Sequence, residues 1–70
     1  MMKILHQRLK ELRQNKSITQ KEMALYLGIT ERSYQRYEAA EREPDIKGLN
    51  KLADYYKVTV DYLLGRTDKP

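Results

Sequence analysis

The stretch ITQKEMALYLGITERSYQRYE, residues 18–38, decides the fold of this chain of 70 residues. Near its start, Thr19 is followed three residues later by Glu22. With this spacing the threonine hydroxyl accepts a hydrogen bond from a backbone amide in the first helical turn, and the glutamate accepts one from the threonine's own amide. This arrangement is a capping box, and it predicts a helix over residues 20–27.

A glycine and a second threonine divide the stretch into two helices. Gly28 can take the left-handed backbone conformation that commonly ends a helix. Thr30 follows two residues later and offers another N-cap hydroxyl, so a second helix is predicted over residues 31–38. Two short helices joined by so tight a corner have the spacing of a helix-turn-helix.

Apolar residues at helical spacing extend the pattern to both sides of this motif. Leu5, Leu9 and Leu12 recur at intervals of four and three, which places them on one face of a preceding helix. Asp45 and Thr59 are N-cap residues for two later helices. We therefore expect an all-α fold, a compact five-helix bundle. The predicted core consists of Leu5, Leu9, Leu12, Ile18, Met23, Ala24, Leu27, Tyr34, Tyr37, Ile46, Leu49, Leu52, Ala53 and Tyr56, with the two helix-three tyrosine hydroxyls reaching water at the edge.

The composition limits the classes of function. The absence of cysteine excludes disulfides, thiolate metal sites and cysteine nucleophiles, and it fits a reducing, cytoplasmic setting. The apolar runs are too short for a signal peptide or a transmembrane helix, so no membrane partner is expected. The length predicts one domain, residues 1–66, followed by a flexible tail, residues 67–70.

The positive charge is concentrated at one end of the chain. The net charge is +4, and the five basic residues of segment 1–16 face a single acid, whereas the remainder is balanced. A sequence pI near 9.4 favours a polyanionic partner such as nucleic acid. Basic small proteins without such a role are common, so the charge alone does not decide the function.

Catalytic chemistry has little support in the sequence. The single histidine, His6, has no partner that the sequence places beside it, and we expect it to be a solvated surface residue. The chain contains no phosphate-binding glycine loop and no metal-ligand spacing, so neither a cofactor, a metal nor a small-molecule ligand is expected. An enzyme is therefore the least supported class.

The outward face of the helix over residues 31–38 suits DNA reading. Arg32 and Arg36 are four residues apart and share one face, while Glu31 and Gln35 form a parallel row. In the major groove of DNA, arginine pairs with guanine and glutamine with adenine, and glutamate accepts from cytosine. An ordinary solvated helix surface would have the same residue types, so both interpretations stay open at this point.

Four motifs together resemble a known family. The sequence combines T-Q-x-E-x-A, the G-I-T corner, the R-Y-E ending of the third helix and a later D-Y-L-L segment. In this combination the chain resembles, over residues 4–68, the Cro/C1-type helix-turn-helix family of bacterial and phage repressors. The resemblance implies the λ-repressor-like type of five-helix fold and a transcriptional regulator of double-stranded DNA.

The resemblance also implies roles for particular positions. The base-reading positions of the family correspond here to Glu31, Arg32 and Arg36, and Gln35 joins them from the outward row. The family's phosphate contacts correspond to Gln20, Thr30 and Ser33, with the glutamine also bracing the recognition helix.

One ion pair is expected between helices far apart in the sequence. Members of the family pair an arginine late in the first helix with the glutamate that ends the third, which here would join Arg13 to Glu38. Both residues flank apolar stripes, which independently favours the pair. Its expected effect is to fix the orientation of the recognition helix rather than to add net stability.

The chain departs from the family after the recognition helix. Many relatives carry a glycine and basic residues there, whereas residues 39–43 read AAERE. Glu41, Glu43 and Asp45 would stand near the phosphates and weaken the electrostatic contribution to non-specific binding. Tyr34 also replaces a smaller aliphatic residue, which changes the expected packing.

Binding as a homodimer is expected, with two recognition helices in half-sites roughly 34 Å apart. The candidate dimer contacts are Val60, Leu63 and Leu64, for which a place in the core explains the residue types equally well. A rival function is a protein-interaction module, such as an antitoxin or adaptor, which the acidic residues after the recognition helix favour.

Overall fold

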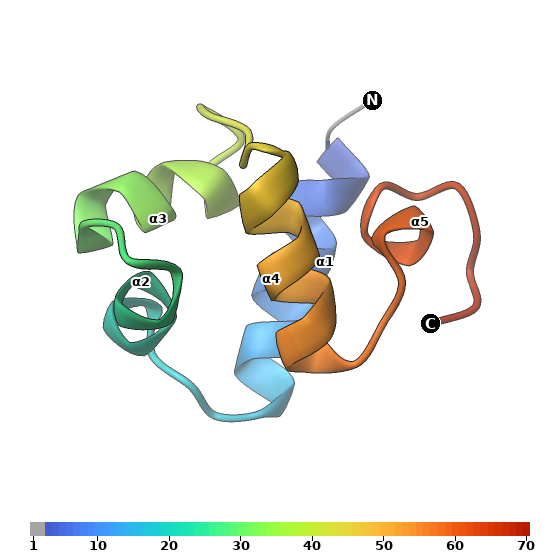
Figure 1. The fold of residues 1–70 in the computed structure, drawn as a ribbon, viewed down its shortest axis with the longest axis horizontal. Coiled ribbons are helices and arrows are strands. Elements are labelled where there is room, and N and C mark those ends of the chain that lie inside the picture. The colour runs from blue at the N-terminus through green and yellow to red at the C-terminus, as the bar shows by residue number, and fades with distance from the viewer. Residues whose placement is uncertain (1–2) are drawn as a thin grey trace.

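The computed structural model describes residues 3–70. This part of the chain contains five helices joined by loops, and it contains no strand (Figure 1). The all-α five-helix architecture is therefore confirmed. Across residues 3–70 no helix is both long and apolar enough to cross a membrane. The first two residues of the expected domain lie outside the described part. The helices are α1 (Lys3–Asn15), α2 (Gln20–Leu27), α3 (Glu31–Glu38), α4 (Ile46–Tyr56) and α5 (Val60–Leu63).

Capping residues set the boundaries of the helices as the sequence predicts. The capping box is complete: the Glu22 amide donates to Thr19 Oγ1 at 3.1 Å, and the Thr19 amide donates to Glu22 Oε1 at 2.9 Å. Gly28 has a φ of 73°, in the left-handed region, and ends α2. The side chains of Thr30, Asp45 and Thr59 accept first-turn amides in the same way and start α3, α4 and α5.

The core lies where α1 and α4 cross the centre of the molecule, with α2 and α3 on one side and α5 on the other (Figure 1). Most predicted core residues are buried or packed against the buried cluster. Ile46 is an exception, because 79% of its surface is exposed. Ile46 occupies the first position of α4. Next to it, the buried residue is Pro44, which belongs to the preceding loop.

Two polar residues of α1 are covered by other parts of the chain, and one of them, His6, was expected at the surface. His6 is 4% exposed, and its Nδ1 donates to the backbone carbonyl of Tyr37 near the C-terminal end of α3. The Arg8 side chain is 16% exposed, and its guanidinium carbon lies 4.0 Å from the centroid of the Tyr62 ring. The expectation of a solvated histidine is therefore wrong, since α3 packs over that side of α1.

The segment after α5 contacts α1 through Arg8. One guanidinium nitrogen donates to the carbonyls of Tyr62 and Thr67, the latter at 2.9 Å, and the other reaches the Asp68 carboxylate at 2.9 Å. The amide of Thr59 also donates to the carbonyl of Pro70 at 3.0 Å. The flexibility of residues 67–70 stays a prediction, but these contacts give the segment a defined course beside α1 and α5.

Candidate nucleic-acid interface

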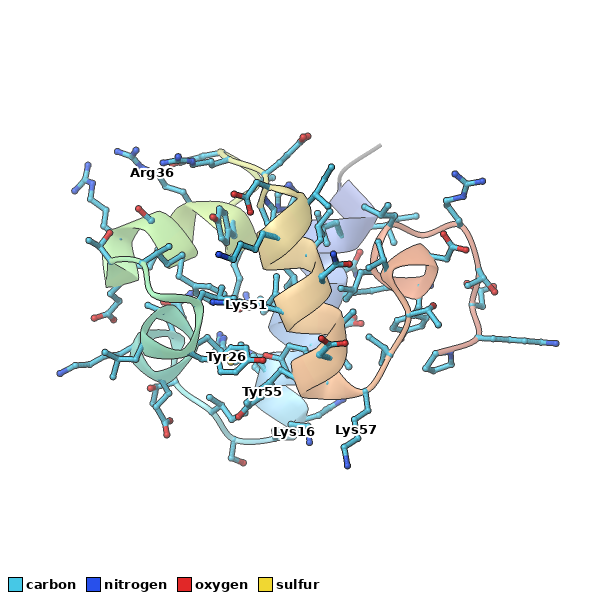
Figure 2. All side chains as sticks on the ribbon, viewed as in Figure 1. Lys16, Tyr26, Arg36, Lys51, Tyr55 and Lys57 are labelled. Atoms are coloured by element: carbon cyan, nitrogen blue, oxygen red, sulfur yellow. The ribbon has the colours of Figure 1, made fainter. Side chains whose placement is uncertain are left out.

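The outward side of α3 carries an exposed row of polar side chains. Glu31, Arg32 and Gln35 are exposed and Arg36 is half-buried. Figure 2 shows the Arg36 side chain extending away from the body of the molecule. Within residues 3–70, none of these four side chains makes a hydrogen bond or an ion pair with another side chain or with the backbone. Their donors and acceptors are therefore available to a ligand.

A hollow of about 300 Å³ lies at the C-terminal half of this row. Arg32, Gln35 and Arg36 line it from α3, and Ala39 and Glu41 close its far end. The structure thus brings together three of the four residues predicted to read base edges. The fourth, Glu31, stands at the first position of α3, outside this hollow.

The N-terminal end of α3 carries two of the predicted phosphate contacts. Thr30 Oγ1 accepts the Ser33 amide at 3.1 Å and donates to Ser33 Oγ at 3.0 Å. The two hydroxyls are adjacent at the positive end of the helix dipole, where anions are stabilised. This end of α3 therefore has the local chemistry of a phosphate contact.

Gln20, the third predicted phosphate contact, lies at the opposite end of α3. Its Nε2 donates to Glu38 Oε1 at 3.1 Å, so it braces the recognition helix as expected. It also lines a second hollow of about 240 Å³ together with Lys10 and Gln35. Lys10 was not among the predicted site residues. The concentration of positive charge in segment 1–16 is the signal that could have pointed to it.

The inner side of α3 is fixed by the expected ion pair, which is present. Arg13 Nε lies 2.6 Å from Glu38 Oε2, and a second guanidinium nitrogen donates to Oε1 at 3.0 Å. Arg13 also donates to the carbonyl of Ile18 at 2.9 Å. Only 13% of the arginine side chain and 4% of the glutamate side chain are exposed. The hydrogen bonds of Arg13 thus join α1 to Ile18, at the start of the helix-turn-helix, and to Glu38 at the end of α3.

Burial and charge act against each other on Glu38. Burial favours the neutral acid, but the hydrogen bonds from Arg13 and Gln20 outweigh it and hold the pKa of the Glu38 carboxyl below its ordinary value. The bond to Glu38 correspondingly raises the pKa of Arg13. Both partners are therefore charged at neutral pH, and the pair is a true ion pair.

Tyr34 differs from what its sequence position suggests. It is completely buried, and its hydroxyl has no hydrogen-bond partner among the described residues. Burial raises the pKa of this hydroxyl, and the nearby Glu38 carboxylate adds to the effect. The hydroxyl of Tyr56 is buried in the same way, and burial raises its pKa too. The expectation that the Tyr34 hydroxyl reaches water is therefore wrong, while its place in the core is confirmed.

The candidate dimer residues lie in or against the core. Leu63 is completely buried, so it has no surface to offer a second copy in this conformation. Val60 and Leu64 are half-buried and pack against the core cluster. The core role left open by the sequence applies to all three, and a dimer contact by the exposed parts of Val60 and Leu64 stays a prediction.

Sequence comparison identifies the class of this fold and site. The profile of the family described as Helix-turn-helix matches residues 9–63, from the middle of α1 to the end of α5. The match contains both capped helices, the left-handed glycine between them and the exposed row on the second. The chain therefore belongs to the Cro/C1-type helix-turn-helix family, which confirms the resemblance of its motifs.

Named relatives are bacterial and phage regulators. The chain is 45% identical over 64 residues to the HTH-type transcriptional regulator ImmR of Bacillus subtilis, covering 91% of this chain and 50% of the relative. It is 40% identical over 62 residues to the cryptic phage CTXphi transcriptional repressor RstR of Vibrio cholerae, covering 89% of this chain and 55% of the relative. The chain thus spans about half the length of these curated relatives.

A solved structure has the same fold. The crystal structure of a transcriptional regulator from Listeria innocua superimposes with a TM-score of 0.87 at 26% sequence identity. The superposition covers 94% of this chain and 62% of the other. The five-helix arrangement therefore occurs in a protein described as a transcriptional regulator.

Proposed function

We propose that the protein is a sequence-specific transcriptional regulator that binds double-stranded DNA and reads the major groove with α3. The observation that carries this proposal is the exposed or half-buried row Glu31, Arg32, Gln35 and Arg36, which has no partner within residues 3–70, on a helix whose other side is joined to α1 by an ion pair. Eight helical residues span roughly 12 Å, which matches the width of the major groove, about 12 Å.

Each member of the row has a base edge that suits its chemistry. Arg32 and Arg36 can each form two hydrogen bonds with guanine O6 and N7, and Gln35 can do so with adenine. Glu31 can accept from the cytosine amino group. Because α3 cannot rotate without breaking the Arg13 contact, these side chains would meet the bases in a fixed register.

Groups at both ends of α3 would hold the DNA backbone. Thr30 and Ser33 present hydroxyls and first-turn amides at one end, and Gln20 with Lys10 stands at the other. Contacts of this kind set the position of the protein on the duplex without reading its sequence. The proposed cytoplasmic location follows from such a partner and from the absence of cysteine.

A repressor acting as a homodimer is the form we propose. The named relative RstR is described as a transcriptional repressor, which supports that sign of regulation. Two copies would place their α3 helices in half-sites roughly 34 Å apart. Val60 and Leu64 supply partly exposed apolar surface to such a pair.

A protein-interaction module is the second candidate. The observation that favours it is the exposure of large apolar side chains away from the outward row, since Leu25 is 73% and Ile46 is 79% exposed. An antitoxin or adaptor would bind its partner through such surface. This candidate needs no DNA contact by α3.

A gel-shift titration on random duplex DNA over a salt series separates the two candidates. The proposed regulator binds at low salt and loses affinity as salt rises, because phosphate contacts release counterions. Selection of bound oligonucleotides from a random pool should then return one symmetric site. Absence of binding at low salt would contradict the proposal and favour the interaction module.

A further inference from the structure

Three acidic residues follow α3, and the structure gives them different positions. Asp45 is the N-cap of α4, where its Oδ1 accepts the Gly48 amide at 2.7 Å. Glu43 is exposed and does not line the hollow beside α3. Glu41 does line it, together with Arg32 and Arg36. Only one of the three acids therefore shares a cavity with the candidate base-reading arginines.

Backbone hydrogen bonds hold Glu41 in this place. Its amide donates to the carbonyl of Arg36 at 3.0 Å, and the amide of Ala40 donates to the carbonyl of Tyr37 at 3.4 Å. Ala40 has a φ of 62°, in the left-handed region. These are the two bonds and the conformation of a Schellman motif, which turns the chain back over the helix end. The Glu41 carboxylate is therefore presented by an ordered turn.

In a complex with α3 in the major groove, the hollow would face the sugar–phosphate backbone of the DNA. Recognition helices enter the major groove with their N-terminal residues at the base edges. The last turn of α3 and residues 39–41 lie roughly 10–15 Å further along, at 1.5 Å per helical residue. That distance is about the width of the groove. Glu41 would thus stand at the groove wall beside the sugar–phosphate backbone.

We propose that Glu41 is a specificity-determining residue that keeps DNA phosphates out of the hollow lined by Arg32 and Arg36. The inference rests on the proposed function. Within residues 3–70 no ion pair of 4.0 Å or less joins Glu41 to either arginine, so the arginines are not neutralised by it. An arginine in an open hollow would otherwise bind any phosphate, regardless of sequence.

The physical basis is repulsion between like charges at short range. A carboxylate at the groove wall raises the free energy of every complex in which a phosphate occupies the hollow. The repulsion is smaller in a complex in which the arginines turn toward guanine, because no phosphate then enters the hollow. Glu41 would therefore lower non-specific affinity more than specific affinity, which increases the ratio between them.

The test compares Glu41→Gln with Glu43→Gln in the full 70-residue chain. Both variants remove one negative charge from the same loop, but only the first removes it from the hollow. Binding is measured on random duplex and on the duplex selected by the wild type, over a salt series. E41Q should bind random duplex roughly fivefold more tightly at low salt, with the gain shrinking as salt screens it. Its affinity for the selected duplex should stay within about twofold.

The alternative outcomes are distinct. Equal gains for E41Q and E43Q would show a general effect of net charge and overturn the inference. Loss of affinity by E41Q for the selected duplex alone would make Glu41 a base contact, which also overturns it. Failure of the wild type and both variants to bind any duplex would overturn the proposed function itself. Unchanged melting temperatures would confirm that the isosteric amide leaves the fold intact.

Discussion

The inner side of α3 differs from its outer side in how its polar groups are held. On the inner side, Glu38 accepts from Arg13 and Gln20, and the carbonyl of Tyr37 accepts from His6. On the outer side, the base-reading candidates are exposed or half-buried, without a side-chain hydrogen bond or ion pair in residues 3–70. One short helix thus carries an inner side that hydrogen bonds join to α1 and α2, and an outer side whose candidate base-reading side chains make no such bond within residues 3–70.

This arrangement indicates how a domain of this size can present a surface that reads DNA. An exposed arginine searches many rotamers, and ordering it on binding opposes affinity. Fixing the helix from behind removes the freedom of the backbone while the side chains keep their donors available. Substitutions on the inner side of α3 should therefore change stability, and substitutions on the outer side should change binding.

Removing Glu38 should have the largest effect. Glu38→Ala leaves the Arg13 guanidinium buried without its counter-charge, and loss of one partner of a buried pair lowers the free energy of unfolding by about 3–5 kcal/mol. Urea denaturation measures this change. Arg66→Ala is the control, because its pair with Asp61 spans 3.8 Å at an exposed site and should contribute less than about 1 kcal/mol. Equal losses in both variants would contradict the special role of the inner side.

Removing the His6 ring should have the next effect. His6→Ala leaves the Tyr37 carbonyl without its donor in a buried place, which lowers the free energy of unfolding by about 1–3 kcal/mol. His6→Asn keeps a donor close to the position of Nδ1 and should recover part of the loss. If both variants were equally unstable in urea, packing rather than the hydrogen bond would be the contribution of His6.

Truncating Arg36 should affect binding and leave the fold unchanged. Arg36→Ala is expected to weaken the selected DNA site by about 1–3 kcal/mol and to relax the preference at one base position. Arg42→Ala is the matched control, since Arg42 is exposed and outside the hollow. Gel shifts on the selected site and its single-base variants measure both. An equal loss on every sequence would make Arg36 a phosphate contact.

Replacing Ala40 by glycine should stabilise the end of α3. Its φ of 62° is unfavourable for a residue with a Cβ atom. Ala40→Gly should therefore raise the free energy of unfolding by about 1 kcal/mol. Ala39→Gly is the control, because Ala39 has a φ of −86° and gains nothing from glycine. A gain in the Ala39 variant and none in the Ala40 variant would be the contrary result.

Acid should weaken the contact of Glu38 on the inner side, and this contact should not change near neutral pH. The folded-state pKa of Glu38 lies below its ordinary value near 4.5. The unfolded chain therefore binds this proton more readily, and the stability present above that value is lost as pH falls through the folded pKa. Denaturation midpoints at about pH 7 and about pH 3 should differ less for Glu38→Gln than for the wild type. An identical acid loss in that variant would assign the effect to other carboxyls.

Local signals in the sequence predicted the helix-turn-helix motif correctly. The spacing from Thr19 to Glu22, the glycine at position 28 and the hydroxyl of Thr30 act within a few residues of each other. Their hydrogen bonds do not depend on the rest of the fold. The pairing of Arg13 with Glu38 came from the family resemblance, with independent support from the apolar stripes that both residues flank, because no local signal joins two residues in different helices.

The burial of His6 and Ile46 was predicted wrongly, because it depends on which other helix covers each residue. His6 lies three positions before Leu9, on the side of α1 that faces the core, and this spacing was the available signal. The expectation of exposure rests on the lack of a partner near His6 in the sequence, but α3 supplies a backbone carbonyl that accepts a hydrogen bond from the ring. The prediction that Ile46 is buried is wrong in the opposite sense. The apolar spacing extends into the first turn of α4, and no other helix covers Ile46 there. The DNA contacts themselves stay predictions.

The polar contacts of α1 also have a consequence for the order of folding during synthesis. His6 and Arg13 find their partners 31 and 25 residues later, and Arg8 finds its partner carbonyl of Tyr62 54 residues later. At roughly 5–20 residues per second, the ribosome needs about 3–11 seconds to make the last of these partners after Arg8. Of the five helices, α1 is made before the other four, and the contacts of its polar groups must wait for residues of α3 and α5.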